Sequence, residues 1–450
     1  MQLNIDLTKG GITSSLLRFT VPMIAGALLQ QCYNIADTII VGQCIGTQAL
    51  AAVGSAYTLM VFIISILLGL SMGAGTVFSL QFGAGKHEKL RQSIFVSFIF
   101  IGIITLALNA VAFIFLDETL VWLQVPGDVE PLMRTYLLYI YGGIIFTFLY
   151  NFYAALLRAV GDSVTPLIFL SVSVVLNIAL DLILIISFDM GIEGAAIATV
   201  ASQAVAAAGI IVFTHIKRPE LKLTHNDMVF SRSSLKEIIS FSSLTCVQQS
   251  VMNFGILMVQ GLVNSFGLAV MAAFAAAVKI DSFAYMPVQE FGNSFSTFVA
   301  QNFGAEKTDR IKRGIRSAFI TAIIFSIAIT LIVFIFAKQL MMIFIAPEEI
   351  EIINIGIQYL RIEGSFYVGI GILFLLYGYY RAIRMPEMSV VLTVLSLGIR
   401  VALSYWLSAI PGIGVSGIWW SIPIGWFIAD FVGILYYRIK IHKHLNIIHE

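Results

Sequence analysis

Apolar runs of about twenty residues or more follow one another along the whole chain, separated by short polar loops. A run of this length is what an α-helix needs to cross the hydrocarbon core of a bilayer. The stretch between the sixth and seventh runs is polar and charged, which indicates a linker. The pattern predicts an all-α membrane protein with twelve transmembrane helices, at residues 14–44, 50–76, 93–116, 133–156, 164–187, 192–214, 238–265, 271–299, 315–337, 356–380, 387–409 and 415–437.

The two halves of the chain resemble each other as copies. Phe82–Lys86 recurs as Phe303–Lys307, 221 residues later, and Arg158-Ala159 recurs as Arg381-Ala382, 223 residues later. Because six spans return the chain to its starting side, the two copies share one orientation in the membrane. We therefore expect two parallel six-helix lobes around a central cleft that opens alternately to each side. The predicted boundaries are an N-lobe at 1–214, a cytoplasmic linker at 215–237, and a C-lobe with a cytoplasmic tail at 238–450.

The composition and the placement of charge agree with this membrane topology. Hydrophobic residues make up 59% of the chain and charged residues only 11%, too few for a soluble protein of this size. Most of the 26 Lys and Arg residues lie in alternate loops and near the termini, and the remaining loops are short and acidic. The positive-inside rule then places both termini in the cytoplasm. We expect a multi-pass protein of the cell membrane, and nothing in the charge indicates nucleic acid binding.

One carboxylate interrupts the first apolar run. Asp37 lies inside 14–44, where a charged side chain costs roughly 2.5–3.5 kcal/mol on insertion scales. Such a group needs a partner, a water-filled cavity or a proton. The equivalent residue of the second copy is Met258, so this acid belongs to the N-terminal copy alone.

Three more polar residues of the N-terminal copy lie within predicted spans. Asn177 and Asp181 are spaced i, i+4 and share one face of the fifth span, and Thr199 lies in the sixth. At a rise of about 1.5 Å per residue, all of them reach the same outer depth as Asp37. The equivalent positions of the second copy hold Arg400, Ser404 and Ile422.

This polar set permits two kinds of chemistry. Two nearby carboxylates cannot both be ionised cheaply in a dry site, so at least one is expected to hold a proton. Alternatively, the carboxylate, amide and hydroxyl oxygens form a site for a hard cation such as Na⁺. Binding of either ion changes the charge that a cationic substrate meets. The residues alone leave both alternatives open, and a packing role for Asn177 and Thr199 also remains open.

Several motifs, in this order, resemble the multidrug and toxic compound extrusion (MATE) transporters. The segments that carry the resemblance are Thr20-Val21-Pro22, Gln81–Gly85, Arg158–Asp162, Leu176–Asp181 and Val299–Ala305. In the branch with an N-lobe cation site, the resemblance implies that Asp37, Asn177, Asp181 and Thr199 bind H⁺ or Na⁺. It also implies that Gln30, Tyr33 and Asn151 line a substrate pocket, and that the first helix bends at Pro22.

The chain departs from another branch of the family. That branch places its cation-binding acids on helices seven and ten of the C-lobe. Here helix seven has no acid and helix ten has only Glu363, which argues against a C-lobe cation site. Glu290 and Arg400 stay unassigned: they either pair across the cleft or satisfy each other.

The resulting functional hypothesis is a secondary antiporter, not an enzyme. It exports amphipathic, often cationic drugs and toxic compounds in exchange for H⁺ or Na⁺, without a cofactor and as a monomer in the lipid bilayer. A lipid-linked oligosaccharide flippase of the same superfamily is the alternative, with Arg400, Lys279 and Arg361 as its cationic residues. Gly83–His87 lacks the Ser/Thr and the glycine of a P-loop, so an ion gradient is the expected energy source.

Overall fold

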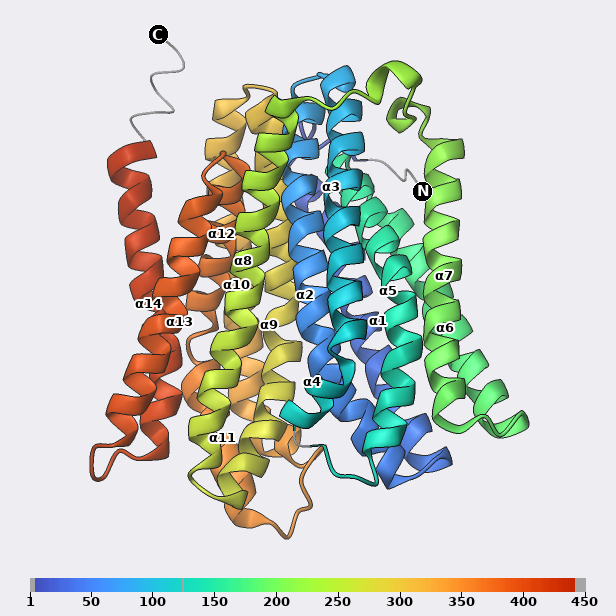
Figure 1. Cartoon of the computed structure of the whole chain (residues 1–450). Coiled ribbons are helices and arrows are strands. Elements are labelled where there is room, and N and C mark those ends of the chain that lie inside the picture. Colours follow the sequence, from blue (N-terminus) through green and yellow to red (C-terminus); the bar gives the residue numbers. More distant parts are fainter. Residues whose placement is uncertain (1–4, 124, 442–450) are drawn as a thin grey trace. The chain divides into compact units, whose positions relative to one another are not determined.

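The structure is a computed structural model that describes residues 5–123 and 125–441. Helices dominate these residues, and no β-strand occurs among them. Figure 1 colours the helices along the chain, from blue at the N-terminus to red at the C-terminus. In chain order they are α1 Ile12–Cys44, α2 Thr47–Gly83, α3 His87–Ile114, α4 Leu116–Trp122, α5 Glu130–Ala159, α6 Val164–Asp181, the π-helix η1 Leu182–Ser187, α7 Gly191–Lys217, η2 Pro219–Leu221, η3 His225–Asp227, α8 Arg232–Asn264, α9 Leu268–Gly304, α10 Thr308–Met341, α11 Ile350–Gly364, α12 Tyr367–Ala382, α13 Pro386–Ser408, α14 Val415–Tyr436 and η4 Tyr437–Ile441.

The helices confirm the predicted all-α membrane architecture. Within the described ranges, eleven spans are individually long and apolar enough to cross a membrane, and one bent pair supplies a twelfth. That pair, α11 and α12, is bent by 51° at a short break, so the predicted continuous span at 356–380 is interrupted. The short helix α4 was not expected from the apolar pattern.

The chain divides into two compact units. The start of α1 belongs to the second unit, and the start of α8 belongs to the first. The first unit contains Val21–Cys246 and the residues up to Asp6, and the second contains Leu7–Thr20 and the chain from Val247 onward. The boundaries therefore fall inside α1 and inside α8, not in loops. Both long helices contribute residues to both units.

Close backbone contact holds the helices of the first unit together. Figure 1 shows α2, α3 and α5 side by side, and contacts join each pair of them. A Cβ built at Gly73 of α2 would lie 2.4 Å from the Phe241 carbonyl oxygen of α8. The Ser242 hydroxyl donates to the Leu70 carbonyl oxygen at 3.0 Å across the same contact. Small residues permit this approach in a protein that lacks a water-driven core.

The second unit uses the same kind of packing and also holds the N-terminal segment. A Cβ at Gly378 of α12 would lie 2.5 Å from the Gly292 carbonyl oxygen of α9. Leu7 is fully buried, and its carbonyl oxygen accepts a hydrogen bond from Asn302 at 3.1 Å. Arg310 donates to the carbonyl oxygens of Leu7, Lys9 and Gly10 at 3.2, 2.6 and 2.8 Å. The segment before α1 is therefore bound to the start of α10.

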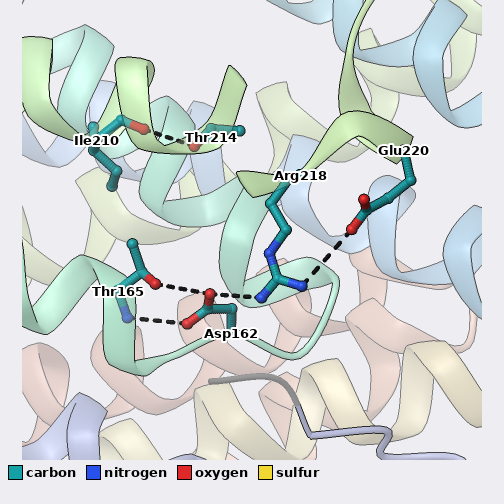
Figure 2. Close-up of polar contacts among 6 residues, drawn as sticks. All are labelled: Asp162, Thr165, Ile210, Thr214, Arg218 and Glu220. Atoms are coloured by element: carbon teal, nitrogen blue, oxygen red, sulfur yellow. Dashed lines mark hydrogen bonds and ion pairs between the residues drawn. The ribbon is translucent and has the colours of Figure 1, made fainter. Parts of the chain in front are cut away.

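An ion pair attaches the linker to the first unit where the linker leaves α7. Asp162, fully buried before α6, accepts hydrogen bonds from the Thr165 N–H at 3.0 Å and the Thr165 hydroxyl at 2.8 Å. Figure 2 shows Arg218 reaching the same carboxylate, at 2.7 Å, while its other terminal nitrogen lies 3.7 Å from Glu220. Asp162 thus satisfies a donor in the first turn of α6 and joins that turn to the end of α7.

The second half of the linker is attached to α3. In η3, Asp227 accepts hydrogen bonds from the Thr224 N–H at 2.9 Å and the Thr224 hydroxyl at 2.5 Å, which forms a capping box. Arg91 of α3 donates to the same carboxylate at 2.9 Å. Lys89 lies 3.2 Å from Glu237 of α8. The linker is therefore an ordered part of the first unit.

Candidate functional site

Two carboxyl groups of the first unit meet in its interior. Asp37 of α1 is 8% exposed and Asp181 of α6 is fully buried. Their side chains lie within hydrogen-bonding distance of each other, although 144 residues separate them in the chain. In such a pair at most one carboxyl is ionised without a large electrostatic cost, unless a cation lies between them. The structure therefore brings together the two acids that the sequence singled out.

Asp181 lies where the α-helix changes its geometry. It is the last residue of α6, and the π-helix η1 begins at the next residue. A π-helical turn inside a span is rare, occurs frequently at functional sites, and leaves the backbone less regularly bonded. The apolar pattern of this span gave no sign of the change.

Asn177 and Thr199 complete the set around Asp181. In the orientation of the Asn177 amide that pairs every donor with an acceptor, its nitrogen donates to Asp181 Oδ2 at 3.0 Å. Its oxygen then accepts a hydrogen bond from the Thr199 N–H of α7 at 3.2 Å. Both residues are buried, at 1% and 7% exposure. All four residues of the predicted ion site therefore converge, whereas their role in ion binding stays a prediction.

One oxygen of each acid has no hydrogen-bond donor. Within the described part of the chain, Asp37 Oδ1 and Asp181 Oδ1 are buried and make no hydrogen bond. Buried carboxylate oxygens without a donor are costly, so these atoms are suited to bind a proton or a small cation. The described residues contain no group of three or more His, Cys, Asp or Glu side chains that could hold a metal ion. A hard monovalent ion or a proton fits this donor set.

Two tyrosines border the acid pair. The Tyr33 hydroxyl lies 3.4 Å from the Thr199 hydroxyl, one helical turn from Asp37 on α1. Tyr136 of α5 is only 8% exposed, and its hydroxyl lies in the same surroundings as Thr199 and the two carboxyl groups. The sequence analysis missed Tyr136 as a site residue, because a tyrosine in an apolar span carries no sign of what it faces.

Gln30, Asn151 and Pro22 are the remaining residues of the predicted site. Gln30 is exposed, and Asn151 of α5 donates to the Thr147 carbonyl oxygen of its own helix at 2.8 Å. Pro22 lies inside α1, directly after Val21, where the first unit resumes. The substrate-binding role of Gln30, Tyr33 and Asn151, and the bend at Pro22, stay predictions.

The second unit holds buried acids that the sequence analysis underestimated. Asp281 of α9 and Glu363 of α11 are 3% and 2% exposed, and they lie within hydrogen-bonding distance of each other. Asp430 of α14 is 4% exposed, with both carboxyl oxygens unbonded within the described residues. The sequence alone could have marked these acids as candidates, because an acidic residue inside an apolar span is functional by default. Asp281 was overlooked beside Lys279, and Asp430 lies near the end of the last span.

Glu290 and Arg400 have different neighbours in this unit. The charge of Glu290 acts on Arg381 of α12, which also donates to the Asn293 side-chain oxygen at 3.3 Å. Arg400 Nε of α13 is buried and has no hydrogen-bond partner within the described residues. Glu290 and Arg400 therefore have separate surroundings within the second unit.

Comparisons with known proteins agree with this architecture. The family model MatE matches residues 22–183 and 245–406. The probable multidrug resistance protein YpnP of Bacillus subtilis is 29% identical over 448 residues, 99% of each chain. The probable multidrug resistance protein NorM of Thermotoga maritima is 27% identical over 77% of this chain and 75% of its own.

Solved structures show the same fold. A MOP superfamily transporter from Pyrococcus furiosus, titled for the reverse polarity of its binding pocket, has a TM-score of 0.92 at 24% identity over 98% of each chain. A multidrug resistance MATE family transporter solved in an outward-facing conformation has a TM-score of 0.91 over 98% of each chain. Since the family match covers both halves of the chain, the protein belongs to the MATE family, whose members are membrane transporters and not enzymes.

Proposed function

We propose that this protein is an ion-coupled antiporter of the cell membrane. It exports amphipathic or cationic toxic compounds in exchange for H⁺ or Na⁺, with both termini in the cytoplasm. Relatives named as multidrug resistance or export proteins in Bacillus subtilis and Staphylococcus aureus support the substrate class. The distribution of Lys and Arg along the loops supports the orientation.

The observation that carries the proposal is the acid pair of the first unit. Asp37 and Asp181 are buried side by side, and each has an oxygen without a donor. An ion bound there neutralises the pair, and its release restores a negative charge inside the unit. A cationic substrate is favoured in the charged state and disfavoured in the neutral state, so the two ligands displace each other. Exchange of this kind links inward ion movement to export.

Alternating access supplies the second part of the mechanism. Because α1 and α8 each contribute residues to both units, a change in the arrangement of the units must deform these two helices. Asp37 lies on α1, so deformation of α1 changes the surroundings of the acid pair. Pro22, which removes one backbone hydrogen bond of that helix, makes deformation there less costly.

Substitution of Asp37 tests the proposal. In everted membrane vesicles, Asp37→Asn is expected to abolish ion-driven transport of a cationic dye, because the amide neither binds a proton nor attracts a cation. Asp117→Asn is the matched control: its exposed carboxylate lies 2.8 Å from Arg134 outside the site, and full transport is expected. Wild-type transport rates in Asp37→Asn would contradict the role of the pair.

The coupling ion is identified by imposing the two gradients separately. Dye movement is measured with a Na⁺ gradient at equal pH, and then with a pH gradient in Na⁺-free buffer. Transport that follows one gradient identifies the ion. Transport that follows neither gradient and requires ATP would contradict antiport.

A further inference from the structure

A cavity of about 330 Å³ lies in the second unit, between α9, α10, α12 and the end of α14. Phe295 of α9 and Leu376 and Tyr379 of α12 are buried and form its floor. Ile315 and Phe319 of α10 are partly exposed and form one side. The last turn of α14 and the π-helix η4 form the other side. Because exposed faces of membrane-spanning helices meet lipid, a lipid chain can reach this cavity.

The cavity contains a hydrogen-bond donor without an acceptor. Tyr379 is 4% exposed, and its hydroxyl makes no hydrogen bond within the described residues. The ring of Tyr437 packs edge-on against the Tyr379 ring, with centroids 5.5 Å apart, but the two side chains make no hydrogen bond with each other. A buried hydroxyl without a partner costs free energy that a ligand oxygen would recover. The lining therefore favours a ligand that carries an oxygen next to an apolar chain.

A positive charge lies at the exposed edge of the cavity. Arg438 lines it, is exposed, and makes no ion pair or hydrogen bond with another described residue. Arg313 and Arg316 of α10, which flank Ile315 in the sequence, are also exposed. None of the described lining residues is acidic, so a cationic compound finds no counter-charge there. Basic pockets between transmembrane helices are typical of sites for acidic lipid head groups.

The internal repeat shows that this arrangement belongs to the second copy alone. Arg438 is equivalent to His215 and Leu376 to Tyr153, each 223 residues earlier. In the first unit the His215 ring packs on Tyr153, with centroids 6.1 Å apart, and His215 Nδ1 lies 2.9 Å from the Ile211 carbonyl oxygen. The first copy therefore pairs its basic side chain within the protein and fills the neighbouring position with a ring. The second copy has a smaller side chain at that position, and its arginine has no such partner among the described residues.

We infer that this cavity binds an acidic phospholipid. One acyl chain enters between α10 and α14, the phosphate pairs with Arg438, and the Tyr379 hydroxyl donates to an oxygen near the phosphate. The volume is at the low end of the roughly 300–1,000 Å³ of ligand pockets, so the cavity holds part of a chain and not a whole lipid. All lining residues belong to the second unit, and the site does not depend on the proposed ion exchange.

Lipid binding to the purified full-length protein tests the inference. Delipidated protein in a neutral detergent is titrated with phosphatidylglycerol or with phosphatidylcholine of the same acyl chains, and native mass spectrometry gives the apparent Kd of the first bound lipid. Phosphatidylglycerol is expected to bind about 5-fold more tightly, because one arginine contributes about 1 kcal/mol to the attraction of anionic lipid. Glycerol phosphate, which has the charge but no chain, is expected not to compete at the same concentration.

Two pairs of variants separate the charge from the cavity. Arg438→Gln is expected to weaken phosphatidylglycerol binding about 5-fold. Arg232→Gln, which removes an exposed arginine at the start of α8, is the control and should bind as the wild type. Ile315→Trp fills the cavity and is expected to abolish binding of the first lipid. Ile320→Trp is its control, because Ile320 is an exposed residue of the same helix that does not line the cavity.

The hydroxyl of Tyr379 has its own test. Tyr379→Phe removes a buried donor that has no partner within the described residues, so the lipid-free variant should unfold at the wild-type temperature or above it. Its affinity for phosphatidylglycerol is expected to fall roughly 2- to 10-fold, the equivalent of one net hydrogen bond. Unchanged affinity would show that the lipid does not use this hydroxyl and would overturn that part of the inference.

Four other results would overturn the lipid site. They are equal affinity of the wild type for the two lipids, equal effects of Arg438→Gln and Arg232→Gln, full lipid binding in Ile315→Trp, and displacement of the lipid by glycerol phosphate or a transported cationic dye. If Ile315→Trp does not fold, the comparison of Arg438→Gln with Arg232→Gln decides the outcome. Loss of ion-driven transport would bear on the proposed antiport alone, since the lipid titration needs no gradient.

Discussion

At the scale of single residues, the site depends on which polar groups face each other inside the first unit. Asp37 and Asp181 were identifiable from the sequence, because a carboxylate in an apolar span is costly unless it has a function. Tyr136 was not identifiable, since its ring suits either lipid or a helix interface. Only the structure shows that it reaches the same place as Thr199.

The hydroxyl of Tyr136 gives a prediction at this scale. Tyr136→Phe removes a buried hydroxyl beside the acid pair while the ring remains, so folding should be unchanged. If the hydroxyl contributes as much as one net hydrogen bond to the ion-bound state, its loss changes the apparent affinity for the coupling ion roughly 2- to 10-fold. Ion-dependence curves of dye efflux measure it. Tyr141→Phe, a buried tyrosine of the same helix, is the control, and an equal effect in both variants would reject the assignment.

At the scale of elements, both units place an acid next to a departure from the α-helix. Asp181 precedes the π-helix η1, and Glu363 precedes the bend between α11 and α12. Hydropathy predicted both spans but neither irregularity, because it reports the length of an apolar segment and not its hydrogen bonding. Neighbouring helices determine whether a span stays regular.

The contact between α2 and α8 gives a prediction about elements. Gly73→Ala places a Cβ 2.4 Å from the Phe241 carbonyl oxygen, and a backbone atom cannot move aside cheaply. Overpacking of this kind costs about 1–3 kcal/mol, so a lower midpoint of thermal unfolding is expected. Gly102→Ala of α3, whose Cβ would lie 3.8 Å from the Phe148 ring, should be tolerated. Equal midpoints in the two variants would show that this contact is not tight.

At the scale of the whole molecule, the boundaries of the units do not follow the repeat seen in the sequence. The segment Leu7–Thr20 belongs to the second unit, and the part of α8 up to Cys246 belongs to the first. The linker, predicted at 215–237, consists of two short 3-10 turns between the ends of α7 and α8. Its ion pairs with Asp162 and Arg91 make it part of the first unit.

Asp227 gives a prediction about this attachment. Burial acts to raise the pKa of Asp227, but hydrogen bonds from Thr224 and the ion pair with Arg91 outweigh it and hold the pKa below its ordinary value. Because the folded-state pKa is lowered, the stability gained is complete above the unfolded-state pKa and is lost as the pH falls through the folded-state pKa. Asp227→Asn should therefore unfold at a lower temperature than the wild type at pH 7, with the difference narrowing as the pH is lowered toward about 3.

Limited trypsin digestion at pH 7 provides a second measurement for the linker. Faster cleavage after Lys222 is expected in Asp227→Asn, because the linker is no longer attached to α3. Glu220→Gln is the control, since its carboxylate is partly exposed and 3.7 Å from Arg218. Cleavage at the wild-type rate in Asp227→Asn would show that other contacts hold the linker.

The sequence by itself determined the helical membrane class, the duplication and the acids of the first unit. These depend on the length of apolar runs and on the cost of a charge in hydrocarbon, which are properties of each segment alone. The tertiary structure decided which helix breaks, which unit each end of α1 and α8 joins, and that Tyr367 of α12 donates a hydrogen bond to the buried Asp281 of α9. Those outcomes depend on contacts between residues far apart in the chain, and such contacts leave no local pattern in the sequence.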